Sequence, residues 1–260
     1  MADIETDGLS LAVADDVAVA DDLPVVTFRS DVTVELVRAS AQDVDVLFAA
    51  RVSTQGEQSL AQLDADPQRS TGLINYLMRD RHGTPFEHNS MTFYVQAPIF
   101  VFREFMRHRM ASYNEESGRY RQLQPVFYVP GPDRRLRQVG KPGAYRFLEG
   151  TPEQFELVQA ETRRICEEAY AAYQRLLEAG VAREVARIVL PLTIYSSMYV
   201  TMNARSLMNF LSLRTAREDS QFPSFPQREI EMCAEGMEEI WAGLMPITHA
   251  AFEANGRVAP

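Results

Sequence analysis

The sequence predicts an α+β fold, in which one mixed domain contains a small, mostly antiparallel sheet and a helical C-terminal half. Two observations lead to this prediction. Short segments of alternating apolar residues occur in the first half of the chain, as expected of half-buried strands. The second half contains long apolar repeats of helical period. With 260 residues, 46% of them hydrophobic, the chain can bury one sizeable core.

The first half is expected to alternate strands and helices. Strands are predicted over residues 32–37 and 91–96 and near 126–129, because their apolar side chains share one face. A helical stretch is predicted over roughly 42–80, interrupted near an Asp-Pro pair. A short helix should begin at a proline and cover 98–109, because a proline costs no hydrogen bond in the first helical turn.

The second half is expected to be helical throughout. Thr151 and Gln154 resemble a capping box, and an apolar stripe follows them until Gly180. Its members are Phe155, Val158, Ile165, Ala169, Ala172 and Leu176. Further helices are predicted at about 181–190, 193–213 and 226–244.

The N-terminal segment, the cysteines and the apolar runs indicate the domain extent and the cellular setting of the protein. Residues 1–24 are small and acidic without a basic residue, so we interpret them as a tail that does not order by itself and residues 25–260 as one domain. Cys166 and Cys233 form no CxxC pair, which favours a reducing, cytoplasmic setting. No segment approaches the roughly 20 apolar residues of a membrane span, and no signal peptide is evident. We therefore expect no association with a membrane.

The charge argues against a nucleic-acid surface. The formal net charge is −10, whereas extended nucleic-acid surfaces neutralise phosphates with clustered Lys and Arg. Lys141 is the only lysine among the 26 Lys and Arg residues. This excess of arginine fits a demand for phosphate donors, but also a codon bias, which we favour for most of the arginines. Where the arginines lie is therefore more informative than how many there are.

The segment from Arg107 to Arg121 is the first candidate site. It contains four arginines, a histidine, two serines and two carboxylates at a predicted helix end and loop. Basic residues in a last helical turn also complement the helix dipole, and serine and glycine are ordinary in loops. Ser117, Gly118 and Arg119, however, offer a hydroxyl, an unshielded backbone amide and a guanidinium in sequence, which suits a phosphate.

Three blocks of this sequence resemble the flavin-dependent thymidylate synthases. Arg107-His-Arg109, seven residues and then Ser117 match the signature of that family. The segments 82–88 and 203–214 resemble two other blocks of the family, in the same order. The resemblance covers roughly residues 30–245, and it implies that residues 25–260 form a single catalytic domain with the fold of that family.

The resemblance implies roles for individual residues. The positions similar to flavin contacts are Thr84, Arg107, His108, Arg109, Glu115, Asn203, Arg205 and Asn209. The positions similar to nucleotide and phosphate contacts are Glu104, Arg107, Ser117, Gly118, Arg119, Arg187 and Arg214. Arg214 matches the arginine that faces the uracil ring and is the catalytic candidate. Glu104 departs from the family pattern, because a glutamine is expected three residues before Arg107.

The resemblance also implies the reaction. It predicts methylation of dUMP to dTMP, with methylenetetrahydrofolate as carbon donor, FAD as the source of hydride and NADPH as the reductant of the flavin. A guanidinium beside the uracil ring can stabilise the anion that makes its carbon nucleophilic. No cysteine nucleophile is expected, because neither cysteine lies in a recognisable activating environment. The family forms homotetramers with shared active sites.

Several alternatives stay open on the sequence. A regulatory module that binds a nucleotide without turnover would need the same Arg and Ser contacts, and another flavin oxidoreductase could use the same scaffold. Arg187 and Arg205 could also lie along apolar neighbours on a solvated helix face. His82 and His88 do not have the spacing of HExxH, and glycine and proline interrupt the helix that such a site needs, so we expect no metal.

Overall fold

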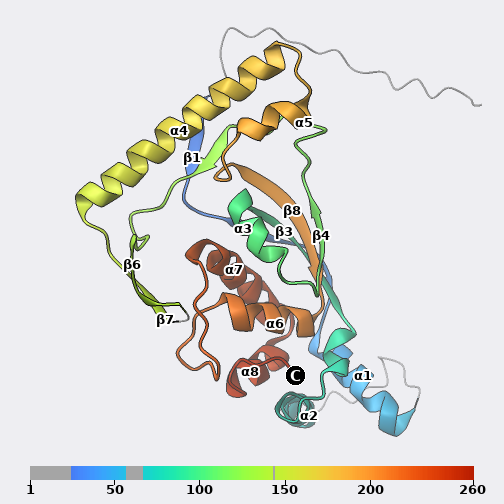
Figure 1. The fold of residues 1–260 in the computed structure, drawn as a ribbon. Helices are drawn as coiled ribbons and strands as arrows, with labels where there is room; N and C mark the ends of the chain where they lie inside the picture. Colours follow the sequence, from blue (N-terminus) through green and yellow to red (C-terminus); the bar gives the residue numbers. More distant parts are fainter. Residues whose placement is uncertain (1–24, 57–66, 143) are drawn as a thin grey trace, which may run out of the picture.

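The computed structural model describes residues 25–56, 67–142 and 144–260, and a curved four-stranded antiparallel sheet lies at its centre (Figure 1). In spatial order its strands are β2 (Thr33–Ser40), β3 (Ser90–Pro98), β8 (Tyr195–Met202) and β4 (Ser112–Glu115). The register places Phe93 of β3 between Leu36 and Val200 of the two neighbouring strands. Phe93 is fully buried, because alternate residues of a strand point to the same face.

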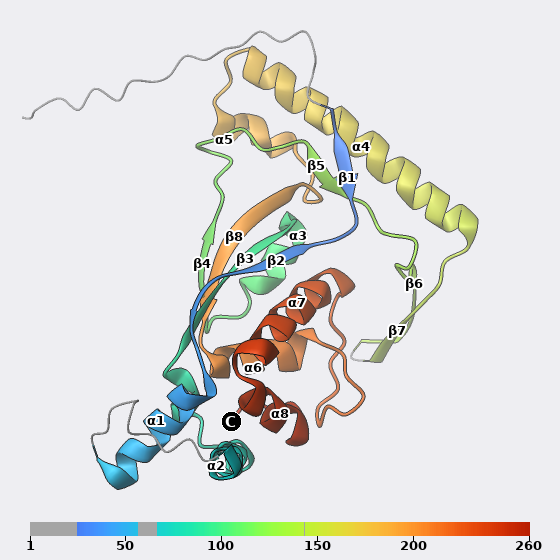
Figure 2. The same cartoon turned by 180° about the vertical axis from the view of Figure 1, so that it is seen from behind.

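Helices cover the buried face of this sheet (Figures 1 and 2). The helices around this core are α1 (Asp43–Gln55), α2 (Pro67–Arg79), η2 (Thr84–Glu87), α3 (Ile99–Phe105), α6 (Ala204–Arg214), α7 (Arg228–Leu244) and α8 (Pro246–Ala254). Phe105 of α3 stacks on Phe210 of α6 at 4.9 Å between ring centroids, and Trp241 of α7 is fully buried. This packing brings the ends of α3 and α6 together, which matters for the site.

A second, smaller core lies under the long helix. Its elements are β1 (Thr27–Arg29), β5 (Val126–Tyr128), α4 (Pro152–Glu178), α5 (Arg183–Ala186) and η3 (Arg187–Val189), and β1 pairs with β5 in parallel. Cys166, Tyr170 and Tyr173 form the buried stripe of α4. The hairpin of β6 (Arg137–Lys141) and β7 (Ala144–Leu148) connects β5 to this helix.

The structure confirms much of the predicted order. The strands predicted at 32–37 and 91–96 are present, as are helices within 42–80 and 226–244. The capping box of the long helix is confirmed, because the Thr151 side chain accepts from the Gln154 backbone amide and the Gln154 side chain accepts from the Thr151 amide. No helix of the described segments combines the length and the apolar character needed to cross a bilayer. The predicted acidic tail lies outside the described residues.

The helix predicted over 193–213 is wrong in its first half. Residues 195–202 are strand β8, the strand that pairs with both β3 and β4, and only 204–214 are helical. The helix predicted over 98–109 ends at Phe105, and the loop expected after it contains β4. The stripe of α4 is also shifted, since Ile165 is exposed. Tertiary pairing of β8 with two neighbours outweighs the local periodicity.

Candidate functional site

The catalytic candidate Arg214 is held against the end of α3. It is the last residue of α6, and its guanidinium Nη1 lies 3.2 Å from a carboxylate oxygen of Glu104. Nη2 is also 3.5 Å from the Glu104 carbonyl oxygen, to which it donates. Both side chains are mostly buried, with 22% and 29% exposed. The structure therefore joins the arginine expected at the uracil ring to the residue that departs from the family pattern.

His108 lies directly beside this ion pair. Its ring packs edge-on against Phe210 at 5.4 Å, and its Nε2 atom is buried without a hydrogen-bond partner. Burial lowers the pKa of His108, and the nearby charge of Arg214 lowers it further. The imidazole is therefore biased toward its neutral form, with a free nitrogen that a ligand can address. Tyr113 fixes this turn by donating to the His108 carbonyl at 2.6 Å and to that of Phe105 at 2.8 Å.

Arg107 and Arg109 flank His108 and are exposed. Neither side chain forms an ion pair or hydrogen bond with another residue of the described segments. Because α3 ends at Phe105, these side chains extend from a turn rather than from a helix face. The turn thus presents two uncompensated cations on either side of a buried imidazole, a combination that suits an anionic group with a polar ring.

The predicted phosphate loop follows β4. The Ser117 hydroxyl accepts from the Arg119 amide at 3.3 Å, and Arg119 forms an ion pair of 2.8 Å with Glu184. Gly118 is buried against Arg187, because a Cβ atom at this glycine would lie 3.3 Å from Arg187 Cδ. The loop and Arg187, which the resemblance assigns to the same ligand, therefore lie side by side although they are far apart in the sequence.

A cavity of about 230 Å³ opens beside this loop and is lined by Glu115, Gly118 and Arg187. Burial raises the pKa of Glu115, and Glu116 adds to this shift, whereas the nearby Ser196 hydroxyl and the charge of Arg187 oppose it. Glu116 and several apolar side chains also line this cavity, so Arg187 and the Gly118 amide are the lining groups that favour an anion.

The remaining candidates surround the beginning of α6. Asn203 caps this helix, because its side chain accepts from the Ser206 amide at 2.9 Å, and Asn209 donates to the Arg205 carbonyl. Arg205 donates to the Pro260 carbonyl at 2.6 Å and forms an ion pair with Glu87. Asn203 therefore precedes the helix, whereas Asn209 lies within it.

Gly83 and Thr84 meet Arg205 from the other side. A Cβ atom at Gly83 would lie 2.6 Å from the guanidinium carbon of Arg205, so only glycine permits this approach. Thr84 is exposed at the start of η2. The candidate residues thus lie in three groups: those around Arg214, those of the phosphate loop with Arg187, and those around the beginning of α6. Because α6 has 11 residues, its two ends, and with them the first and third groups, are about 16 Å apart.

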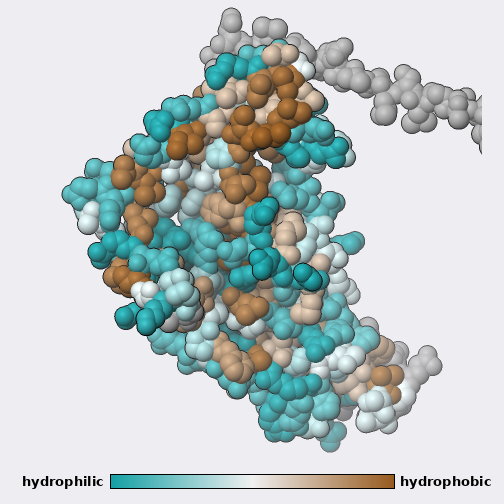
Figure 3. All heavy atoms as spheres, in the orientation of Figure 1, coloured by the Kyte–Doolittle hydropathy of each residue, from teal (hydrophilic) through white to brown (hydrophobic). Residues whose placement is uncertain are grey.

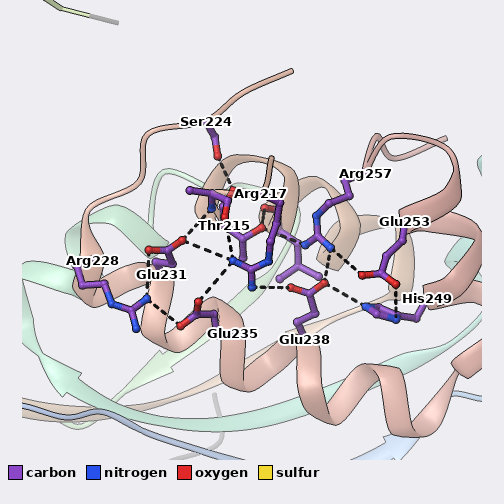
Figure 4. A network of polar contacts seen from close by, with 12 residues as sticks. Thr215, Arg217, Ser224, Arg228, Glu231, Glu235, Glu238, His249, Glu253 and Arg257 are labelled. Atoms are coloured by element: carbon purple, nitrogen blue, oxygen red, sulfur yellow. Dashed lines mark hydrogen bonds and ion pairs between the residues drawn. The ribbon is translucent and has the colours of Figure 1, made fainter. Parts of the chain in front are cut away.

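A polar network fixes the segment that follows Arg214 (Figure 4). Arg257 is 4% exposed, and its guanidinium Nη1 lies 2.7 Å from Glu238 of α7. Its Nη2 donates to the Thr215 hydroxyl at 3.1 Å, and the Ala216 amide donates to Glu231 at 2.8 Å. The sequence analysis missed this network, because its members are distant in sequence and match no motif.

Within the described residues, one group of side chains is close enough together to hold a metal ion, and it belongs to this network. It consists of Glu238, His249 and Glu253. The guanidinium of Arg257 already lies within 4 Å of both carboxylates, at 2.7 and 3.6 Å. These side chains therefore form an ion-pair cluster.

The structure is an α+β protein whose candidate site places a hydroxyl, a glycine amide and guanidinium groups where an anionic ligand could bind. The family model described as thymidylate synthase complementing protein matches residues 35–247. A flavin-dependent thymidylate synthase of Streptomyces coelicolor is 70% identical over 93% of this chain and 98% of its own length. One of Tropheryma whipplei is 64% identical, over 90% of this chain and 97% of the relative.

A solved structure gives the same result. The crystal structure of the UMP/dUMP methylase PolB from Streptomyces cacaoi, bound with 5-Br dUMP, is 57% identical and superposes with a TM-score of 0.86. The alignment covers 90% of this chain and 100% of that chain. The chain therefore belongs to the flavin-dependent thymidylate synthase family. It is accordingly an enzyme of the methyltransferase class that depends on FAD.

Proposed function

We propose that the protein methylates C5 of dUMP to form dTMP, and that Arg214 polarises the uracil ring. The observation that carries this proposal is the position of Arg214, a mostly buried guanidinium at the end of α6 that is tethered to Glu104. A permanent, planar cation in a partly desolvated site can stabilise the anionic ring from which the carbon attacks. A protein that only bound the nucleotide would not need a cation there.

Several residues of this chain fit the flavin. The buried, unpartnered Nε2 of His108 offers a polar contact to a ring, and Arg107 and Arg109 offer uncompensated charges to a phosphate. When bound, FAD supplies the hydride for the transferred carbon. Methylenetetrahydrofolate is the proposed carbon donor, and NADPH is the proposed reductant of the flavin.

The nucleotide phosphate is assigned to the loop after β4. Ser117, Gly118 and Arg119 would supply a hydroxyl, an amide and a guanidinium, and Arg187 closes the same cavity. Arg119 must exchange its ion pair with Glu184 for the phosphate, and because that pair is about half exposed it costs little to break. The loop after β4 would thus bind the phosphate of the nucleotide, and Arg214 at the end of α6 would polarise its ring.

The proposed reaction has no protein nucleophile. Burial raises the pKa of the Cys166 thiol, despite a hydrogen bond with Thr193 that opposes the shift. Burial also raises the pKa of Cys233, which is fully enclosed in α7. Thiols of this kind are not activated, since the thiolate is the reactive form. Activation of the uracil must therefore come from charge stabilisation and from the flavin.

We further propose a cytoplasmic homotetramer in which a second copy completes each site. The phosphate loop and Arg214 belong to different groups of candidate residues within one chain, so a second copy can bring such groups together. Beside the loop, Val185, Ile188 and Leu192 expose 50%, 75% and 56% of their surface. Figure 3 shows hydrophobic spheres gathered over the region of α5 and the segment that follows it. Apolar surface next to an incomplete polar site is a typical interface between subunits.

A spectroscopic experiment tests the function. The purified protein should show flavin absorbance and convert dUMP to dTMP when NADPH and methylenetetrahydrofolate are added without air. Arg214→Ala should keep the fold and the flavin but lose methylation, whereas Ser117→Ala should mainly weaken dUMP binding. A protein that takes up no FAD would refute the proposal. Flavin reduction without dTMP formation would favour a different oxidoreductase on the same scaffold.

The extent of the catalytic unit is also a proposal. Residues 25–260 should act as one catalytic domain, and deletion of residues 2–24 should leave the kcat and the KM for dUMP unchanged, because a small, acidic segment without a basic residue is not expected to order by itself. Sedimentation of the same two proteins tests the tetramer. A loss of activity on deletion would assign the tail to the site.

A further inference from the structure

A cavity of about 630 Å³ lies apart from the phosphate loop. Its walls are the β6–β7 hairpin, the segment 133–135 that leads into it, the connection between α6 and α7, and the first turns of α7. In Figures 1 and 2 the hairpin and the α6–α7 connection run side by side. The volume is in the range of sites that hold a cofactor-sized molecule.

The cavity wall is positive in an acidic protein. Arg134, Arg135, Arg146 and Arg228 line it together with the acids Asp133 and Glu231, whereas the chain as a whole has a net charge of −10. A concave surface of opposite sign to the protein focuses an anionic ligand.

Two of these arginines are free to bind a ligand. Arg134 is paired with Glu229 at 2.7 Å, and Arg228 with Glu235 at 2.8 Å. Arg135 and Arg146 are exposed, and neither guanidinium has an ion pair or hydrogen bond within the described segments. Two unpaired guanidinium groups in the lining, one just before the hairpin and one on β7, suit phosphate or carboxylate groups.

Aromatic rings supply the other half of the lining. Tyr145 and Phe147 of β7 and Phe225 of the α6–α7 connection line the cavity. Phe225 is 55% exposed, so its ring is open to a ligand in the cavity. Rings beside guanidinium groups bind planar aromatic ligands that carry negative charge.

The cavity adjoins the segment that follows the catalytic candidate. Ala216, two residues after Arg214, lines the cavity, and its amide is held by Glu231 of the same wall. A ligand bound here contacts the connection whose start carries Arg214.

We propose that this cavity binds one of the two co-substrates through an aromatic group that carries phosphate or carboxylate. This inference rests on the proposed function, which requires two such ligands. NADPH carries phosphates and methylenetetrahydrofolate carries carboxylates, so the same chemistry has two sources. The two sources are separated by experiment.

The test uses Arg135→Gln, Arg146→Gln and Phe225→Ala in the full-length FAD-bound protein. Arg164→Gln, a change of an exposed arginine on α4, is the matched control. Binding of NADPH and of methylenetetrahydrofolate is measured separately by fluorescence titration, together with the KM of each. Each arginine variant should weaken binding of one co-substrate about tenfold, which corresponds to the loss of one charge-assisted contact. The affinity for dUMP, the flavin content and the control should be unchanged.

The outcomes are distinct. A change confined to NADPH assigns the cavity to the dinucleotide, and a change confined to the folate assigns it to the carbon donor. Unchanged binding of both, or an equal loss of dUMP affinity, overturns the inference. If the wild-type protein binds the co-substrates in this cavity but forms no dTMP, the proposed function fails while the binding site stands. If dTMP forms at the same rate and KM in all variants, only the binding site fails.

Discussion

Arg257 offers a sharp test of how the segment after Arg214 is held. The change Arg257→Gln removes a guanidinium that is 4% exposed and lies 2.7 Å from Glu238. It also removes the donor to the Thr215 hydroxyl, directly after Arg214. Glu238 would remain in the interior with His249 at 3.1 Å and Arg217 at 3.7 Å. The variant therefore leaves a buried carboxylate undercompensated.

The expected loss follows from two estimates. Removing one partner of a buried ion pair costs about 3–5 kcal/mol, and the remaining contacts with His249 and Arg217 place this case near the lower end. Burial alone would raise the pKa of Glu238, but hydrogen bonds from His249 and Arg257 outweigh it and lower the pKa to about 2. Against an ordinary value of 4.5, this shift also corresponds to about 3 kcal/mol.

The pKa shift gives the direction of the pH dependence. Because the folded-state pKa of Glu238 is depressed, the stabilisation is fully present above pH 4.5 and is lost as the pH falls toward about 2. When the pH is lowered from 4.5 to about 2, the free energy of unfolding should therefore fall by about 3 kcal/mol more in the wild-type protein than in Glu238→Gln.

The assay is urea unfolding at a fixed protein concentration and pH 7, with thermal melting alongside. Arg257→Gln should reduce the free energy of unfolding by about 3 kcal/mol and the melting temperature by about 6–12 °C. Arg164→Gln, in an ion pair of α4 with both side chains 54% exposed, should change the free energy by less than about 1 kcal/mol. A loss below about 1 kcal/mol for Arg257→Gln, or additive effects of Arg257→Gln and Glu238→Gln, would refute the reasoning.

Three further changes test the site. Glu104→Gln removes the carboxylate that competes with the nucleotide for Arg214, so calorimetry should detect dUMP binding that is several-fold tighter; weaker binding would mean that Glu104 itself accepts from the uracil. Gly118→Ala places a Cβ atom 3.1 Å from Leu123 Cδ1 and 3.3 Å from Arg187 Cδ, so the loop must shift and the Kd for dUMP should rise about tenfold; an unchanged Kd would remove this loop from the phosphate site. Cys233→Ala should retain the kcat, because burial keeps the pKa of this thiol raised, and an inactive, folded variant would contradict a mechanism without a cysteine nucleophile.

The sequence could predict elements that are specified by neighbouring residues. Helix α4 follows from Thr151 and Gln154, which satisfy each other's backbone amides in the first turn. Strand β3 follows from the alternation that buries Phe93. In contrast, Tyr195–Met202 has no local signal strong enough to separate a strand from a helix, and pairing with β3 and β4 decides its conformation.

The candidate site divides in the same way. The sequence by itself determined the chemical groups of the site: the turn with Arg107, His108 and Arg109, the loop at Ser117 and the arginine at 214 are short motifs whose residue types specify anion binding. Only the tertiary structure decided their partners. Glu104 and Arg214 are 110 residues apart and meet because aromatic packing fixes the ends of α3 and α6. Local chemistry is encoded in neighbouring residues, whereas long-range ion pairs depend on how complete elements pack around the core.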